Sequence, residues 1–434
     1  MQMVRLKDIC VGKGEYGIAA SAEDFASNKY RYLRITDISD FGELLNNDCK
    51  SVSCDSCEKY LLSEDEIVFA RTGNSTGRAF FYEKKYGPLV YAGFLIKFHI
   101  DRNKVNPKFL KYYTISKTYK DWIANGPTGS TRGNMSEGDF ADMPVFLPSR
   151  QVQDSLVAMM EPIDDKINNN TAICSDLEGM AKLLYDYWFV QFDFPDENGK
   201  PYKSSGGKMV WNEDLKREIP AGWEVKPLSA FIFESKNGDW GNDKPKKKDD
   251  IEVTCFRGAD FASITDDYQV TAPIRYISAN NADRLLSDGD LVTEISGGSP
   301  TQATGRVGYI NQKFLDRNGG KMDCSNFCKA FTPMKRFYQY WLYQTWKAFY
   351  DAGVMFNYES KTTGIKNLMF DEFITWVRVP APSDELLKKY QEVCSQYYDK
   401  IQEEFIESTQ LASLRDFLLP MLMNGQVKIK NDEA

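Results

Sequence analysis

The motif Asp164-Asp165-Lys166-Ile167 recurs about 234 residues later as Tyr398-Asp399-Lys400-Ile401. Each copy lies in a long segment that contains little glycine and many helix-forming residues. Each segment also follows a strand end marked by proline, at residues 146–148 in the first case and at residues 379–382 in the second. The chain is therefore predicted to consist of two similar units, each of which ends in a long helix.

A weaker repeat extends upstream of the two helices. Residues 32–38 resemble residues 255–261, and residues 62–68 resemble residues 286–292. The offset drifts from about 223 to about 234 residues along the chain, as expected when surface loops carry the insertions. The runs between the loops are short and rich in strand-forming and aromatic residues, which favours a compact, β-dominated domain with a few helices in each half.

Two polar loops follow in each half, at residues 71–78 and 129–134 in the first and at residues 296–306 and 361–367 in the second. Ordinary surface turns would explain any one of them. However, both halves carry such a pair at comparable places, and each pair combines Arg or Lys with Asn, Gln, Ser or Thr, the side chains that contact DNA phosphates and read base edges. The residues predicted to contact DNA are Arg71, Thr72, Asn74, Ser75, Arg78, Thr131, Arg132, Asn134, Ser299, Gln302, Thr304, Arg306, Thr362, Thr363, Lys366 and Asn367.

The two predicted helices carry the pattern of a coiled coil. In the first, apolar or permissive residues follow in steps of four and three from residue 156 to residue 188. One position of this seam, Asn170, is polar, and its counterpart in the repeat is Glu404; such a residue fixes the register of a helix pair, or else faces a third element. Pro162 is expected to kink the first helix or to begin its long part. Because a linker returns the chain, the helices are predicted to pair antiparallel about a pseudo-twofold axis. The seam of the second helix is Tyr390, Cys394, Tyr397, Ile401, Leu411, Leu418 and Leu422.

The composition excludes several classes of protein. Of 434 residues, 42% are hydrophobic and 14% aromatic, which is ample material for packed cores and excludes a disordered chain. The 54 basic and 62 acidic residues give a net charge of −8, so a protein that coats nucleic acid indiscriminately is not expected. A DNA site on such a chain must be a local basic face or be completed by a partner. No apolar run approaches the roughly 18 residues of a membrane-spanning helix.

Histidine and cysteine usage limits the metal and redox chemistry. The single histidine, His99, lies in a strand-like run and is predicted to be structural. The odd number of cysteines and the lack of a signal peptide predict reduced thiols in the cytoplasm. The spacing Cys49-x4-Cys54-x2-Cys57 offers only three zinc ligands and no second pair, so no metal site is predicted.

The sequence carries no convincing catalytic motif. Its nearest approach to the Asn-Pro-Pro-aromatic tetrad of a DNA methyltransferase is Asn106-Pro107-Lys108, and residues 206–209 lack the spacing and hydroxyl of a phosphate-binding loop. Asp196, Glu224 and Lys226 fit the pattern PD…ExK of a magnesium-dependent nuclease. However, the pattern is short, and Asp196 lies in a turn-rich linker, so a stand-alone nuclease is the alternative interpretation and not the preferred one.

Four stretches resemble the specificity (S) subunit of type I restriction–modification systems, and the resemblance covers essentially the whole chain. The match is most specific at residues 184–195 and 198–207, which look like the end of the central helix and the linker of that family. Residues 219–223 look like the entry to its second recognition domain, and residues 411–425 look like the end of its second helix.

The resemblance implies a non-catalytic, DNA-binding subunit of a cytoplasmic DNA methylation and restriction complex. In the family, two target-recognition domains each read half of a bipartite site in double-stranded DNA. Two helices hold the domains apart and dock two methyltransferase (M) subunits, and a restriction (R) subunit with motor and nuclease activity can join. The chain itself is expected to need no cofactor, because S-adenosylmethionine binds the methyltransferase partner.

The predicted fold is α+β, with two β-rich recognition domains separated by two long antiparallel coiled-coil helices. The expected boundaries are residues 1–148 for the first recognition domain, 149–194 for the first spacer helix, 195–220 for the linker, 221–382 for the second recognition domain, 383–425 for the second helix and 426–434 for the tail. Besides the nuclease, a coiled-coil interaction scaffold without a DNA role is the other alternative.

Overall fold

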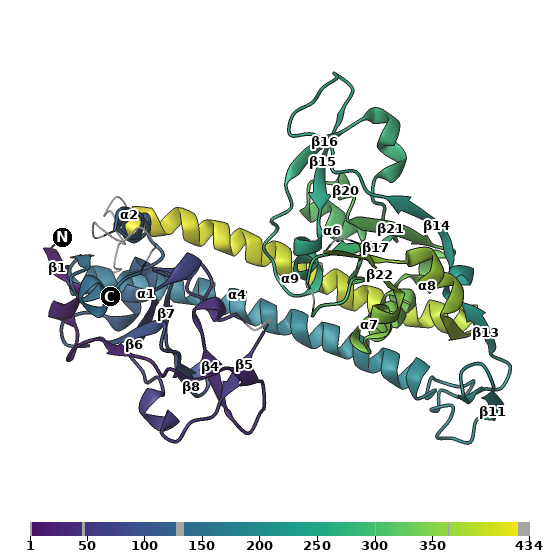
Figure 1. Ribbon diagram of the computed structural model, residues 1–434, viewed down its shortest axis with the longest axis horizontal. Coiled ribbons are helices and arrows are strands. Elements are labelled where there is room, and N and C mark those ends of the chain that lie inside the picture. The colour runs from purple at the N-terminus through teal and green to yellow at the C-terminus, as the bar shows by residue number, and fades with distance from the viewer. Residues whose placement is uncertain (1, 46–47, 127–133, 300, 363, 424–434) are drawn as a thin grey trace, which may run out of the picture. The chain divides into compact units, whose positions relative to one another are not determined.

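The computed structural model describes residues 2–45, 48–126, 134–299, 301–362 and 364–423 (Figure 1). The chain divides into two compact units. The first combines Met1–Asp165 with Ala412–Ala434, and the second is Lys166–Leu411. Both long helices therefore contribute residues to both units.

The first unit is built around two four-stranded sheets. One has the order β2-β9-β6-β7, with β2 (Glu15–Tyr16), β9 (Leu95–His99), β6 (Glu66–Ala70) and β7 (Ala79–Phe81). The other has the order β3-β5-β4-β8, with β3 (Glu23–Asp24), β5 (Lys50–Val52), β4 (Tyr30–Leu33) and β8 (Leu89–Tyr91), and its β4–β8 pair is parallel. A separate antiparallel ladder joins β1 (Gln2–Arg5) to β10 (Pro144–Leu147).

Short helices cover the first sheet. They are α1 (Pro107–Tyr113), α2 (Lys117–Asn125) and α3 (Glu137–Ala141), and side chains of Asn106, Ser116 and Ser136 accept backbone N–H groups at their N-termini. In the core between helices and sheet, Phe69 stacks on Phe140 with the ring centroids 4.9 Å apart. Leu156 of the first long helix and Leu419 of the second belong to the same buried cluster.

The second unit repeats this plan. Its main sheet has the order β14-β21-β17-β19, with β14 (Ile232–Asn237), β21 (Cys328–Pro333), β17 (Leu291–Glu294) and β19 (Val307–Tyr309). The second sheet is β16-β15-β20, with β16 (Ile274–Ile277), β15 (Ile251–Phe256) and β20 (Met322–Cys324), and its β15–β20 pair is parallel like β4–β8. The ladder of β13 (Glu224–Pro227) with β24 (Arg378–Ala381) corresponds to β1–β10. The helices are α5 (Ala262–Thr265), α6 (Gln312–Arg317), α7 (Gln339–Asp351) and α8 (Phe370–Trp376).

One side-chain clamp reproduces the repeat in atomic detail. The backbone N–H and the guanidinium group of Arg34 both donate to Asp37, and those of Arg257 donate in the same way to Asp260. Each arginine also donates to the carbonyl oxygen of the residue 14 positions later. The matching contacts confirm that the two halves are structural copies.

The long helices are α4 (Arg150–Tyr185), followed by a π-helical turn at Asp186–Val190, and α9 (Asp384–Met423). The α4 helix continues through Pro162, so Pro162 does not begin it. Within the second unit, Cys174 contacts Ile401 and Tyr390 contacts Ala181, so the two helices run antiparallel as predicted. The β-rich sheets of the two units and the antiparallel pairing of the two long helices confirm the predicted α+β fold class.

Three segments differ from the sequence-based expectations. Within residues 195–220, expected to be linker, β11 (Met209–Asn212) and β12 (Arg217–Pro220) form a hairpin. The second unit has an additional sheet, β18-β23-β22, made of β18 (Ser296–Gly297), β23 (Ile365–Leu368) and β22 (Glu359–Thr362). Cys54 and Cys57 form a disulfide, so the expectation of reduced thiols is wrong for this pair.

Candidate nucleic-acid interface

In the first unit, the first polar loop contacts Met135, the residue that follows the second polar loop. The loop of residues 71–78 connects β6 to β7, and the Arg71 carbonyl oxygen accepts the N–H of Met135 at 2.8 Å. The Arg71 guanidinium group donates to the Met135 carbonyl and lies over the ring of Tyr16, 5.2 Å from its centroid. The segment that follows residues 127–133 therefore lies beside the first loop.

Two of the predicted contact residues in this unit, Arg78 and Ser75, have limited access to solvent. Arg78 donates to the Asp40 carboxylate at 2.7 Å and to the Ile38 carbonyl oxygen at 3.1 Å. Ser75 is buried. Asn74 and Asn134 are exposed, and Arg71 and Thr72 are half-buried. Thr131 and Arg132 lie outside the described residues.

In the second unit, the additional sheet brings the corresponding loops together. Residues 296 and 297 form β18, which pairs with β23 of the β22–β23 hairpin. The Ser296 hydroxyl donates to the Asn367 side-chain oxygen at 2.6 Å. The loop that follows β17 is thereby joined to the hairpin that carries the last group of predicted contact residues.

A buried ion pair fixes this arrangement. The Glu359 carboxylate accepts the N–H of Thr304 at 2.7 Å and its hydroxyl at 3.1 Å, and it lies 3.2 Å from the Lys366 ammonium group. The Lys366 ammonium group also donates to the Gln302 carbonyl oxygen at 2.7 Å. Because Thr304 and Lys366 are buried, their contacts hold the loop on the hairpin.

Arg306 has a similar internal role. Its guanidinium group makes two hydrogen bonds to the Glu294 carboxylate, both at 2.9 Å, and a third to the Gly258 carbonyl oxygen at 2.7 Å. Paired bonds of this kind fix both side chains. Gln302 is exposed, and Ser299 and Asn367 are half-buried. The side chain of Thr362 and the whole of Thr363 lie outside the described residues.

The residues of the nuclease pattern serve local structure. The Asp196 carboxylate accepts the N–H groups of Asn198 and Lys200, both at 2.8 Å, and so closes its own turn. Glu224 and Lys226 pair with each other at 2.7 Å on β13, and the bond to Lys226 lowers the pKa of Glu224. No cluster of three or more His, Cys, Asp or Glu side chains suited to a metal ion occurs in the described part of the chain.

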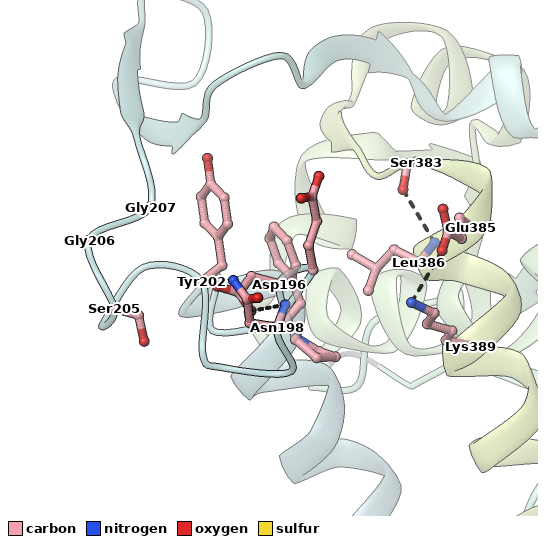
Figure 2. A pocket seen from close by; sticks show the side chains of 13 residues that line it. Asp196, Asn198, Tyr202, Ser205, Gly206, Gly207, Ser383, Glu385, Leu386 and Lys389 are labelled. Atoms are coloured by element: carbon pink, nitrogen blue, oxygen red, sulfur yellow. Dashed lines mark hydrogen bonds and ion pairs between the residues drawn. The ribbon is translucent and has the colours of Figure 1, made fainter.

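A cavity of about 480 Å³ lies in the second unit, where the linker turn meets the start of α9. Figure 2 shows Asp196, Asn198 and Tyr202 on the linker side and Ser383, Leu386 and Lys389 on the helix side. None of the residues predicted to contact DNA lines this cavity. On its linker side, Phe194, Pro195, Asn198 and Tyr202 belong to segments that carry the family resemblance.

Comparison with known proteins decides the family. Residues 1–178 match the family model of the type I restriction modification DNA specificity domain. The chain is 23% identical over 453 residues to the HindI specificity subunit of Haemophilus influenzae, covering 89% of this chain and 93% of that protein. It is 22% identical over 347 residues to the MjaIX specificity subunit of Methanocaldococcus jannaschii, covering 76% and 71%.

This chain belongs to the specificity subunits of type I restriction–modification systems. Its fold is also similar to that of the crystallised S subunit from M. genitalium, with a TM-score of 0.53 and 16% identity over 97% of this chain and 95% of that one. As a DNA specificity subunit, the chain is a non-catalytic component. No described helix of this specificity subunit is long and apolar enough to span a membrane.

The role of Glu359 can be tested by substitution. Glu359→Ala should leave Lys366 as a buried, unpaired ammonium group and should release Thr304. Removing one partner of a buried ion pair costs about 3–5 kcal/mol, so we expect a lower free energy of unfolding of the second unit. Amide hydrogen exchange measured by mass spectrometry should be faster in residues 296–306.

Gln302→Ala provides the control, because the Gln302 side chain is exposed in the same loop. This variant should exchange like the wild type. Wild-type exchange in Glu359→Ala would contradict the role assigned to the ion pair.

Proposed function

We propose that each unit of this specificity subunit binds one half of a bipartite site in double-stranded DNA. We further propose that α4 and α9 set the distance between the halves and dock two methyltransferase subunits. The observation that carries this proposal is the shared construction of the two units. Each has a four-stranded sheet of matching order and a second sheet with a parallel pair. The loop after β6 is hydrogen-bonded to Met135, directly after the second polar loop of its unit, and the segment after β17 pairs with β23.

The proposed DNA contacts are the accessible polar side chains among the described residues of these loops, together with four predicted residues whose side chains lie outside the described part of the chain. They carry amide, hydroxyl and guanidinium groups, which suit base edges and phosphates. Thr304 and Lys366 of the same loops are buried, and their contacts hold the proposed DNA-contacting residues in place. The proposed contacts are Arg71, Thr72, Asn74 and Asn134 with Thr131 and Arg132 in the first half, and Ser299, Gln302 and Asn367 with Thr362 and Thr363 in the second.

Matched apolar residues on the long helices support docking of two like subunits. Leu183 of α4 is 69% exposed, and its counterpart in the repeat, Phe417 of α9, is 61% exposed. Met180 and its counterpart Leu414, three positions earlier, are exposed as well. Grouped exposed apolar side chains are typical of protein–protein interfaces. Because the repeat supplies the same patch twice, it suits two copies of one partner, and S-adenosylmethionine would be bound by those methyltransferase subunits.

Exchange of one recognition domain tests whether each unit recognises its half-site independently. Replacing residues 1–148 with the equivalent domain of another specificity subunit should change one half of the methylated motif and leave the other half unchanged, because each unit has its own loops. The exchanged domain should retain Lys111 and Tyr112, whose side chains bind Asp164 of α4. Sequencing that detects methylated bases gives the motif. A change in both halves would contradict the proposal.

Substitution of the helix patches tests the docking surface. Leu183→Asp and Phe417→Asp place a charge on an exposed apolar surface without disturbing a core, so each should reduce the methyltransferase stoichiometry from two subunits to one. The double variant should bind none. Native mass spectrometry of the reconstituted complex measures the stoichiometry, and Trp376→Asp, at a 70% exposed position of α8, is the control. Full occupancy in the double variant would place the docking surface elsewhere.

Lengthening both helices tests whether they act as a ruler. Four residues inserted between Asp165 and Lys166, together with four between Leu411 and Ala412, add about 6 Å to the helix pair at 1.5 Å per residue. One base pair spans about 3.4 Å, so the unspecified gap in the methylated motif should grow by one or two base pairs. A four-residue insertion in a coiled coil is tolerated as a stutter. Methylation at the original gap would show that the helices do not set the distance.

A further inference from the structure

A tight turn before β9 exposes a large aromatic side chain in the first unit. The N–H of Leu95 donates to the Ala92 carbonyl oxygen at 2.8 Å, which closes a β-turn with Gly93 and Phe94 at its centre. The Phe94 side chain is 59% exposed. Burial of a phenylalanine side chain is favourable, so its exposure at the tip of an ordered turn calls for a physical reason.

The second unit has the same turn before β21. The N–H of Cys328 donates to the Ser325 carbonyl oxygen at 2.8 Å, and Phe327 occupies the position of Phe94. The Phe327 side chain is 52% exposed. The neighbouring residues differ between the copies, since Gly93 corresponds to Asn326, yet both copies present a phenylalanine at the same place. Single exposed apolar residues are common, whereas this one occurs twice at an equivalent position.

A glycine braces each turn from one side. A Cβ atom on Gly17 would lie 2.2 Å from the Ala92 carbonyl oxygen, and one on Gly238 would lie 2.3 Å from the Ser325 carbonyl oxygen. Neither position can accept a side chain without movement of the backbone. Each phenylalanine is therefore presented on a turn whose backbone is packed against a neighbouring strand.

On its other side, each turn is hydrogen-bonded to the start of the first polar loop of its unit. The Phe94 carbonyl oxygen accepts the N–H of Arg71 at 3.0 Å. The Phe327 carbonyl oxygen accepts the N–H groups of Ile295 and Ser296, at 2.8 and 3.2 Å. In both units the exposed ring thus belongs to the residue that is bonded to the first residues of the polar loop.

We propose that Phe94 and Phe327 are specificity-determining residues, each of which makes an apolar contact with the major-groove edge of a base pair in its own half-site. This inference rests on the proposed function. The apolar group on that edge is the thymine C5 methyl, which phenylalanine contacts in DNA complexes. The polar side chains of the adjoining loop then supply hydrogen bonds, and the ring supplies the contact that they cannot make. Neither residue belongs to the polar loops from which the DNA contacts were predicted.

The test uses the complex reconstituted with its methyltransferase subunits and a DNA duplex that carries the motif methylated by the wild type. Phe94→Ala and Phe327→Ala should each weaken binding to this duplex roughly tenfold or more. They should leave binding to an unrelated duplex unchanged, and each should relax one position in its own half of the motif. Phe94→Leu and Phe327→Leu retain an apolar group and should recover part of the affinity.

Thymine-to-uracil substitution identifies the contacted atom. Replacing the thymines of one half-site one at a time by uracil removes only the methyl group. Uracil at one of these positions should weaken binding of the wild type and should leave binding of the corresponding Ala variant unchanged. Phe233→Ala is the control, because Phe233 is 66% exposed on β14 beside the Pro333 end of β21, the end opposite Phe327. This variant should bind like the wild type.

The outcomes separate the inference from the proposed function. If the wild type methylates a bipartite motif but both Ala variants bind like the wild type, the inference alone is overturned. If the Ala variants lose methyltransferase subunits in native mass spectrometry, the rings contact a protein and the inference is overturned as well. A wild-type complex that recognises no bipartite motif would overturn the proposed function, and the inference with it.

Discussion

The contact of Asn170 with α9 is the constraint on which the arrangement of the helix pair depends. Its side-chain amide donates to the Glu404 carbonyl oxygen, to Glu407 and to Ser408, at distances of 2.9 to 3.4 Å. Asn170 and Glu404 are 234 residues apart, so a residue meets its own counterpart in the repeat. A buried polar group in an apolar seam must keep its partners, and a shift by one turn would remove them. The register of the two helices is therefore set by a contact between two equivalent positions of the repeat.

The two units attach to these helices through different chemistry at equivalent positions. In the first unit, Asp164 of α4 binds Lys111 at 2.8 Å and Arg415 at 3.2 Å. Burial alone would raise the pKa of Asp164, but the two cations lower it below its ordinary value. In the second unit the counterpart of Asp164 is Tyr398, whose ring packs 4.4 Å from that of Tyr309 and 4.5 Å from that of Tyr340. The fold of the repeat is thus compatible with either an ionic or an aromatic interface.

The sequence was sufficient for the features that depend on periodicity, and insufficient for those that depend on long-range pairing. The repeat, the two helices and the polar seam position follow from spacing alone. The burial of Thr304 does not, because its partner Glu359 is 55 residues away and lies on a hairpin that the pattern did not reveal. Nor does the sequence show that Arg306 pairs with Glu294 and Arg78 with Asp40. The turns that carry Phe94 and Phe327 are too short to produce a periodic signal.

The composition of the first unit has a consequence for synthesis on the ribosome. Its buried cluster includes Leu419 and Leu422, which are translated only after the whole of residues 166–411. During translation the first unit must therefore wait with an apolar surface uncovered, while the second unit, which is continuous in sequence, can complete its own core first. The first unit, although its synthesis begins first, thus receives its last core residues after those of the second unit have been made.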